Sequence, residues 1–464
     1  MSVHEPLGAT PQSGAFELTR PSPATRGRSV HARTGQLGLV GLLLTGLVIS
    51  LSAAGTESLL PESVRPVPGW LAGPFGSSGL DLGGPGLIAV LVAMFISYLV
   101  AVRASQHLSG RIVLMSIAAL HALVLLAPPL LSTDVFSYQA YGRMGAVYGL
   151  NPYLHGPHAI ALDPLYPFIG ARWVSTPSSY GPVFTTLSYV LAPLSIAASA
   201  LAYKAIAAVA SLATIVFVWN SARLRGLDPV RAVALVGLNP LIVVYGVGGG
   251  HNDLLMLAAV AGGIYLLLRG RERAGGAMLV LGVAVKLTAG LLVPFAIAAG
   301  GGRRTRQRRR DVTLGAAVAL GLVVVLGFGV FGTGPLHLLG TLQQSQAAGG
   351  WHSIPGFIGT GLGLGPVGHA AGLVLLALFA CGLGWLLRRV WRGELDWLDG
   401  AGWATVGLLV SASALLPWYV AWLMPLAALG TDRRLTRTAI VLAVIVQGID
   451  LLGYIPQSTS PLGI

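Results

Sequence analysis

The chain has 464 residues, of which 54% are hydrophobic and only 10% are charged, and its mean hydropathy is +0.75. A soluble domain cannot cover so many apolar segments, so the composition excludes a soluble globular protein and predicts an all-α, multi-span membrane protein. The net charge of +13 does not indicate nucleic-acid binding, because most basic residues lie in short loops between apolar runs. The single cysteine, Cys381, excludes a disulfide within the chain.

The first 36 residues are rich in Ser, Pro, Thr and Arg and have no apolar face. We therefore expect residues 1–36 to form a disordered cytoplasmic N-terminus. The first apolar run begins only at Leu37 and leads into further runs, which does not fit a cleavable signal peptide. Residues 37–464 are predicted to form a single transmembrane domain.

Apolar runs follow one another along this domain and predict about thirteen membrane spans. The runs are Leu37–Ala54, Leu87–Val102, Ile112–Leu131, Ala202–Ala222, Ala232–Tyr245, Leu254–Leu268, Ala274–Val285, Leu287–Ala299, Val312–Phe331, Ala370–Leu387, Ala401–Leu416, Tyr419–Leu429 and Ala439–Leu452. Several are shorter than the roughly 20 residues that a straight span needs, so their boundaries are soft.

The basic residues predict the orientation of these spans. With the N-terminus in the cytoplasm, 24 of the 29 Lys and Arg residues fall in cytoplasmic segments. The long segment Ser132–Leu201 is then on the outer side. Within it Val183–Ala200 is apolar but contains Pro193, and we expect it to be a helix lying in the membrane interface.

The region Ala274–Gly300 is flanked by two arginine clusters that must both be cytoplasmic, so the chain between them must cross the membrane an even number of times. This predicts two short helices that meet near Lys286 and Thr288, or equally a re-entrant hairpin. In either case Lys286 lies at the turn, away from the cytoplasm.

Polar chemistry is concentrated in Ser132–Pro157, which follows an apolar run directly and brings an acid, four tyrosines, an arginine and a histidine. An ionisable group placed there is a functional candidate, which makes Asp134 the first candidate carboxylate. A second interpretation is that Asp134 caps an interfacial helix, since Ser-Thr-Asp suits a helix N-terminus. The two interpretations are compatible.

A second polar cluster, Gly248–Asp253, stands directly before the run that begins at Leu254. Glycines allow a tight backbone turn, and Asn252 or Asp253 could cap the following helix. Capping does not explain His251, although an interfacial histidine is more often a hydrogen-bonded structural residue. The predicted topology gathers these groups at the outer face with others: Asp134, Tyr138, Arg143, His155, His158, Asp163, Tyr180, His251, Asn252, Asp253 and Lys286.

Six short motifs in combination resemble a known family. They are D-V-F-S-Y-x-x-Y-G from Asp134, N-P-Y at Asn151, Y-G-P at Tyr180, N-P at Asn239, G-G-H-N-D at Gly249 and V-K-L-T at Val285. The pattern is similar to the polyprenol-phosphate-mannose-dependent alpha-1,6-mannosyltransferases of actinobacteria, in the GT-C class of multi-span glycosyltransferases. The similarity runs from about Ile112 to Leu429.

This resemblance implies a GT-C-type helical bundle with a large extracytoplasmic catalytic loop, residues 132–201. It implies that Asp134 is the base, that mannose comes from polyprenyl-phosphate-mannose, and that the acceptor is a mannosylated lipid. It further implies an inverting alpha-1,6 transfer at the plasma membrane, in lipomannan or lipoarabinomannan assembly. Here the loop follows the third apolar run, whereas many members of the class place it after the first.

The expected site contains the residue types that this sugar transfer requires. Displacing a lipid phosphate from a sugar needs a carboxylate to take the acceptor proton and a cation to hold the phosphate. Asp134 is the best carboxylate, with Asp163 second because Asp-Pro indicates a turn. The available cations are Lys286, Arg143 and Lys204, although Lys286 and especially Lys204 could instead extend toward the membrane interface.

Sugar-binding candidates complete the expected site: Tyr138, Tyr180, His251, Asn252, Asp253 and His352. His352 belongs to the outer loop Gly332–His369, which could form another wall of the site. Trp418 and Tyr419 could stack on a sugar, but we interpret them as part of the aromatic belt at the membrane surface. No spacing demands a metal ion or other cofactor, although a divalent ion stays open.

Two alternatives remain for the function. A transferase of another polyprenyl-phosphate-linked sugar, such as glucose or arabinose, is the nearer one. A transporter or flippase for a lipid-linked sugar is the alternative from another class. A transporter predicts paired repeats and ionisable groups near the membrane midplane, whereas this chain has no evident repeat and its acids cluster at one face.

Overall fold

The computed structural model describes residues 23–53, 69–76, 78–300, 305–347, 353, 356, 369–413 and 415–452. None of these residues lies in a β-strand, so the all-α prediction is confirmed for the described part of the chain. The α-helices are α1 Pro23–Ser52, α2 Gly83–Ala104, α3 Gly110–Leu126, α4 Asp134–Ala146, α5 Pro182–Leu191, α6 Ile196–Leu224, α7 Pro229–Gly237, α8 Asp253–Leu268, α9 Glu272–Val285, α10 Leu292–Ala298, α11 Thr305–Phe331, α12 Leu338–Ala347, α14 His369–Trp391, α15 Trp397–Ser411, α16 Met424–Leu429 and α17 Arg433–Leu452.

Short tighter or wider helices connect several of these elements. The 3-10 helices are η1 Gly73–Phe75, η2 Ser105–His107, η3 Pro157–Ile160, η4 Tyr166–Phe168, η5 Ala171–Trp173, η7 Leu287–Leu291, η8 Gly334–His337 and η9 Pro417–Trp422. One element, η6 Leu241–Val247, is a π-helix. A π-helical segment is often found at a functional site, and η6 borders the cluster described below, as do η7 and η9.

Six helices of the described chain are long and apolar enough to cross a membrane, so the protein is a multi-pass integral membrane protein. They are Val30–Ser52, Gly83–His107, Ile196–Leu224, Thr305–Phe331, Val374–Trp391 and Arg433–Leu452. The pair of α7 and η6, bent by 48°, gives a seventh candidate. Each of the thirteen predicted runs coincides with helical residues, but several of these helices are short, and thirteen crossings stay a prediction.

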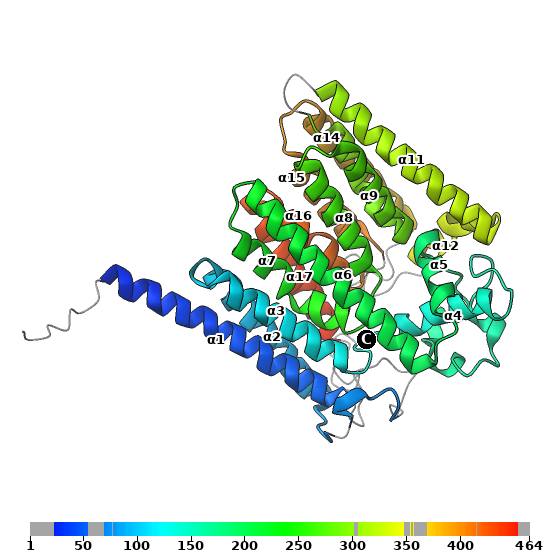
Figure 1. The fold of residues 1–464 in the computed structure, drawn as a ribbon, viewed down its shortest axis with the longest axis horizontal. Coiled ribbons are helices and arrows are strands. Elements are labelled where there is room, and N and C mark those ends of the chain that lie inside the picture. Colours follow the sequence, from blue (N-terminus) through cyan, green and yellow to red (C-terminus); the bar gives the residue numbers. More distant parts are fainter. Residues whose placement is uncertain are drawn as a thin grey trace, which may run out of the picture.

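The helices are arranged as a bundle in which α1, α2 and α3 lie together on one side and α11 runs along the opposite side (Figure 1). Helix α9 packs between α8 and α11, and α8 also packs against α6. Helices α4 and α5 pack against each other at one end of the bundle, in the segment that precedes α6 (Figure 1). The candidate site lies where this pair meets α8, α9 and η9.

Glycines allow several helix pairs to approach backbone to backbone. A Cβ atom at Gly38 of α1 would lie 2.8 Å from the Ala101 amide nitrogen of α2. Between α9 and α11, a Cβ at Gly276 would overlap the Val312 carbonyl oxygen, and one at Gly315 would overlap that of Arg273. Close contact at small residues is the usual way in which membrane helices associate, and it accounts for part of the high glycine content.

The N-terminal part of α1 differs from the sequence-based expectation. We expected disorder up to residue 36, whereas the helix begins at Pro23 and includes residues 23–36. The reason is tertiary packing: His31 stacks on His107 with ring centroids 5.1 Å apart, and Gly35 lies against Ala104 at the end of α2. These contacts extend the span beyond its apolar part. Residues 1–22 lie outside the described chain.

The expected interfacial helix Val183–Ala200 is also different, because it is not one helix. Helix α5 ends at Leu191, a short break contains Pro193, and α6 begins at Ile196. Proline removes a backbone donor and disfavours a continuous helix, and the Ser195 side chain caps the new helix by accepting from Ala198 N. The last residues of the predicted segment therefore belong to the long helix α6.

The predicted pair of short helices around Lys286 is present. Helix α9 ends at Val285, Lys286 has an extended backbone, and η7 with α10 follows and packs back on α9. The break puts the Lys286 side chain at the end of α9, beside the start of α8.

Candidate functional site

Asp134 is the first residue of α4 and is not its side-chain cap. The N-cap position is Thr133, and the Asp134 amide donates to Ser132 Oγ at 3.1 Å. The carboxylate lies in the first turn, where the helix dipole favours negative charge, and keeps 15% of its surface exposed. Three residues earlier, Leu131 has φ 55°, the one non-glycine residue with positive φ among those described. Strain of this kind is common beside functional sites.

The glycine-rich turn Gly248–Gly250 positions His251 beside Asp134. The Leu130 amide donates to the Gly248 carbonyl at 3.0 Å, which joins the turn to the segment just before α4. Gly250 has φ 68°, a conformation that favours glycine. His251 is fully buried, and its Nδ1 lies 3.4 Å from Asp134 Oδ2.

Tyr138 lies one helical turn after Asp134 and links the acid to the turn. Its hydroxyl is 3.5 Å from Asp134 Oδ2, 3.5 Å from His251 Nδ1 and 3.4 Å from Asn252 Oδ1. Burial, reinforced by the negative charges of Asp134 and Asp253, raises the pKa of Tyr138, so its hydroxyl stays protonated. These hydrogen bonds are long, which leaves the Asp134 carboxylate free to accept a stronger one.

Asp253 binds Lys286 rather than capping α8. Lys286 Nζ lies 2.8 Å from Asp253 Oδ1 and 2.9 Å from Oδ2, and the Trp422 indole donates to Oδ1 at 2.6 Å. The N-cap of α8 is Asn252, which makes no side-chain cap hydrogen bond. The capping interpretation is therefore wrong for both residues. Lys286 is already neutralised by an acid, with 12% of its side chain exposed.

Tyr180 is held beside Tyr138 by the Y-G-P turn. The two rings are edge to face with centroids 5.1 Å apart. The next residue, Gly181, donates its amide to the Val285 carbonyl at 3.0 Å, and a Cβ there would overlap the Ala284 carbonyl oxygen. The turn is thus fixed to the end of α9, immediately before Lys286.

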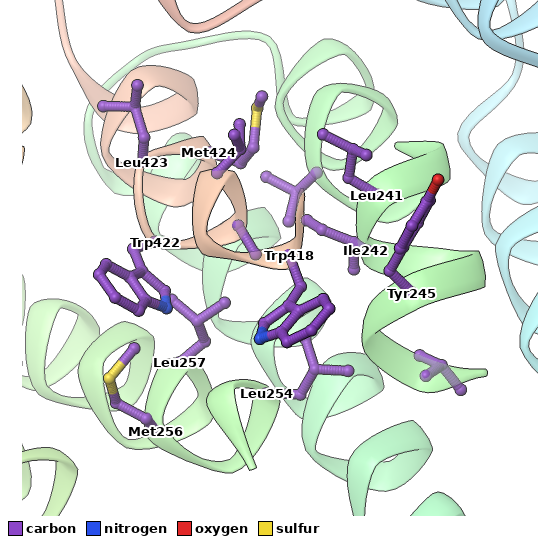
Figure 2. Packing of buried hydrophobic residues seen from close by; sticks show 14 of the residues in the cluster. Leu241, Ile242, Tyr245, Leu254, Met256, Leu257, Trp418, Trp422, Leu423 and Met424 are labelled. Carbon is purple, nitrogen blue, oxygen red and sulfur yellow. The ribbon is translucent and has the colours of Figure 1, made fainter. Parts of the chain in front are cut away.

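The element η9 supplies an aromatic wall for the site. Trp418 stacks on His251 with centroids 3.7 Å apart, and Tyr419 stacks on Trp422 at 4.3 Å. The Lys286 ammonium lies 4.6 Å from the Tyr419 ring centroid and 5.3 Å from that of Trp422, within the range of cation–π attraction. Figure 2 shows Trp418 and Trp422 projecting from η9 toward Leu254, Met256 and Leu257 of α8.

This arrangement corrects our assignment of Trp418 and Tyr419 to the membrane belt, because both contact the polar cluster. Sequence reasoning missed Trp422 entirely. The pattern Trp-Tyr-Val-Ala-Trp after Pro417 could have indicated it, since it places three aromatic rings within five residues at the end of an apolar run.

Two predicted cations lie elsewhere. Arg143 pairs with Asp163 at 2.7 Å, and the Tyr148 hydroxyl donates to the same carboxylate at 2.7 Å. Burial of Asp163 opposes its ionisation, but these hydrogen bonds outweigh burial and hold the pKa of Asp163 below its ordinary value. Lys204 is buried, and its ammonium donates to the Ala127 and Pro128 carbonyls after α3. It neither joins the site nor extends to the surface.

The structure therefore brings together seven of the predicted site residues: Asp134, Tyr138, Tyr180, His251, Asn252, Asp253 and Lys286. Arg143, Lys204 and Asp163 are held by other partners. His352 lies outside the described residues, so its predicted role stays untested. Within the described chain no group of three His, Cys, Asp or Glu side chains is placed to hold a metal ion.

Comparison with known proteins gives matches along most of the chain. A family model described as the N-terminal domain of alpha-(1->6)-mannopyranosyltransferases matches residues 35–300, and one described as the MptB C-terminal domain matches residues 349–450. An alpha-(1->6)-mannopyranosyltransferase of Mycobacterium tuberculosis is 28% identical over 404 residues, covering 70% of this chain and 66% of that protein. A probable alpha-(1->6)-mannopyranosyltransferase of Mycolicibacterium smegmatis is 30% identical over 376 residues, with the same two shares.

A third relative, alpha-(1->6)-mannopyranosyltransferase B of Corynebacterium glutamicum, is 27% identical over 347 residues, 66% of this chain and 56% of that protein. The chain thus spans between 56% and 66% of the length of these relatives. No solved structure matches it. The first family model covers more than half of the chain and includes Asp134, His251 and Lys286. The chain therefore belongs to the alpha-(1->6)-mannopyranosyltransferase family.

Proposed function

We propose that this chain is an inverting glycosyltransferase that moves mannose from polyprenyl-phosphate-mannose to a mannosylated lipid acceptor, forming an alpha-1,6 linkage. Family membership supports the mannosyl specificity, and the membrane helices support lipid-linked substrates. The observation that carries the proposal is the Asp134 carboxylate, partly exposed and weakly hydrogen-bonded, beside the buried Lys286–Asp253 pair.

In the proposed reaction the acceptor hydroxyl gives its proton to Asp134 as its oxygen bonds to the anomeric carbon of mannose. The bond between that carbon and the phosphate oxygen breaks at the same time, and the electron pair leaves with the lipid phosphate. A single in-line displacement inverts the anomeric centre, so a beta-linked donor gives an alpha-linked product. Lys286 offsets the charge of the leaving phosphate, which is electrostatic stabilisation where charge develops.

Arg143 and Lys204, which we expected to bind the donor, have no role in this proposal because other groups hold both cations. Tyr138, Tyr180 and His251 position Asp134 and the substrates. We place the site on the outer side of the plasma membrane, with the N-terminus in the cytoplasm, on the distribution of basic residues. The product would then serve lipomannan or lipoarabinomannan assembly.

The test is transfer of radiolabelled mannose from polyprenyl-phosphate-mannose to a synthetic alpha-1,6-dimannoside by the protein purified in detergent. We expect a labelled trimannoside in which an exo-alpha-mannosidase releases the label. Parallel reactions with glucose- and arabinose-linked donors measure the sugar preference. Product from either of these donors, with none from the mannosyl donor, would contradict the proposal, as would an absence of product from all three.

A further inference from the structure

Three buried side-chain nitrogens in the site have no hydrogen-bond partner among the described residues; one is His251 Nε2, which donates in only one tautomer, and the other two are always N–H donors. These two donors are the Asn252 side-chain amide nitrogen, Nδ2, and the Trp418 indole nitrogen, Nε1. Asn252 is 3% exposed and Trp418 is 6% exposed. A buried donor without a partner is costly, so buried N–H groups in folded proteins nearly always have one. Two such donors beside a candidate catalytic carboxylate indicate that a group of a bound ligand accepts hydrogen bonds from them.

The neighbours of these two donors fix their direction. Asn252 Oδ1 accepts from the Tyr138 hydroxyl at 3.4 Å, so the NH2 end of the same amide is the end left free. Trp418 is held by its stack on His251, with 21° between the ring planes. His251 in turn contacts Asp134, so one imidazole joins the indole to the carboxylate. In Figure 2 the indole nitrogen of Trp418 faces the side on which Trp422 lies.

The charges of the cluster indicate which ligand group fits there. Among the described residues the cluster holds two acids, Asp134 and Asp253, and one cation, Lys286, which pairs with Asp253 and not with Asp134. The negative charge of Asp134 would repel a phosphate oxygen placed next to it. A hydroxyl avoids this repulsion, because it donates its proton to the carboxylate while its oxygen accepts from N–H groups. Asp134 and Lys286 are both partly exposed, so the cluster is open at this edge.

We infer that Asn252 and Trp418 bind the acceptor sugar by donating hydrogen bonds to the hydroxyl that attacks the donor. This inference rests on the proposed function. As the proton moves to Asp134, the attacking oxygen gains negative charge until its bond to the anomeric carbon is complete. The two N–H groups stabilise that charge without having to reorganise. Asn252 and Trp418 are therefore assigned to acceptor binding, whereas Lys286 is assigned to the donor phosphate.

Two conservative variants remove one donor each. Trp418→Phe keeps a ring on His251 but has no N–H, and Asn252→Leu keeps a similar side-chain volume but has no NH2 and adds no charge beside Asp134 and Asp253. Each variant is expected to raise the acceptor KM about tenfold, which corresponds to about 1.4 kcal/mol. The donor KM is expected to change less than about twofold. Trp403→Phe is the matched control, because the Trp403 indole donates to Asp432, outside the cluster, and neither KM should change.

A rise in the donor KM with an unchanged acceptor KM would overturn the inference and indicate a phosphate-binding role. No change in either KM would overturn it as well. Equilibrium binding of an octyl alpha-1,6-dimannoside, without donor, gives a second readout that does not depend on turnover. We expect weaker binding by both variants. Absence of transfer by the unmodified protein would contradict the proposed function, while equal dimannoside binding by the unmodified protein and both variants would contradict this inference alone.

Discussion

Lys286 and Asp253 act as a unit at the residue scale. From the sequence we predicted that Lys286 is an isolated cation that binds the lipid phosphate. In the structure its ammonium group contacts both carboxylate oxygens of Asp253 and lies over the rings of Tyr419 and Trp422. A buried ion pair is sensitive to loss of one partner, because the other charge is then left uncompensated. The donor phosphate would therefore meet a cation that is already oriented.

Lys286→Met should destabilise the protein, because the buried Asp253 carboxylate then keeps only the Trp422 N–H as a side-chain donor among the described residues. The expected loss is about 3–5 kcal/mol in the free energy of unfolding. The double variant Lys286→Met/Asp253→Asn removes both charges and should recover part of this stability, a coupling that a double-mutant cycle measures.

In the fraction of Lys286→Met that remains folded, the donor KM should rise much more than the acceptor KM, because the cation that offsets the phosphate is gone. Thermal unfolding in detergent measures the first effect, and steady-state kinetics with each substrate varied measures the second. Equal increases in both KM values would show that Lys286 has only a structural role.

Most members of the site could be predicted from single residues, but their partners could not. Asp134, His251 and Lys286 stand out in the sequence as polar groups at the ends of apolar runs. The sequence could not show that Arg143 forms an ion pair with Asp163. Nor could it show that the Trp422 indole donates a hydrogen bond to Asp253, which is 169 positions away in the chain. These pairings depend on tertiary packing, which local pattern does not encode.

At the scale of the elements, breaks in helices position the site. Helix α9 stops at Val285, η6 widens into the glycine turn before His251, and η9 is tightened so that three aromatic rings face one cluster. The sequence predicted the break at Lys286 from the charge pattern. The sequence did not predict that one helix ends and another begins around Pro193, because the residues on both sides of Pro193 are apolar.

The contact between the Y-G-P turn and α9 gives a prediction for this scale. Gly181→Ala would place a Cβ on the Ala284 carbonyl and push α5 away from α9, so Tyr180 and Lys286 would move apart. Overpacking of this kind typically costs about 1–3 kcal/mol. We expect a lower unfolding temperature and reduced kcat.

Gly329→Ala in α11 is the matched control for this variant. A Cβ at Gly329 meets no atom within 4 Å, and alanine favours a helix, so stability and activity should be kept or slightly improved. If Gly181→Ala were as stable and active as the control, the close contact would not be what positions the site.

At the scale of the whole molecule, composition predicted the helical membrane architecture, because only helices and closed barrels satisfy their backbone groups within a bilayer. The number of crossings was harder to predict. Several helices near the site, including α3, α8 and α9, are shorter than the hydrocarbon thickness, and α8 packs between α6 and α9. Short buried helices and true spans have similar apolar sequences.

The proposed orientation predicts that the loop around Leu162 faces outward. Leu162 is 100% exposed, so a Leu162→Cys variant made in a Cys381→Ser background should react with a membrane-impermeant thiol reagent in cells stripped of any outer barrier. Leu224 is the last residue of α6, at the end of that helix away from the Leu162 loop, and it is also exposed. A Leu224→Cys variant should therefore react only after the membrane is permeabilised. The reverse pattern would contradict the orientation and place the site in the cytoplasm.

The central claim is that Asp134 takes the proton of the acceptor hydroxyl, and turnover of Asp134→Asn tests it most directly. Asparagine keeps the shape of the side chain but cannot act as the base, and a general base typically contributes about 10² to 10⁴ in rate. With both substrates saturating, we expect kcat of Asp134→Asn to fall by that factor while folding and dimannoside binding are kept. Asp163→Asn, which loses a structural pair with Arg143, should fall less than about tenfold. Near-normal turnover by Asp134→Asn, with loss in Asp163→Asn, would contradict the account.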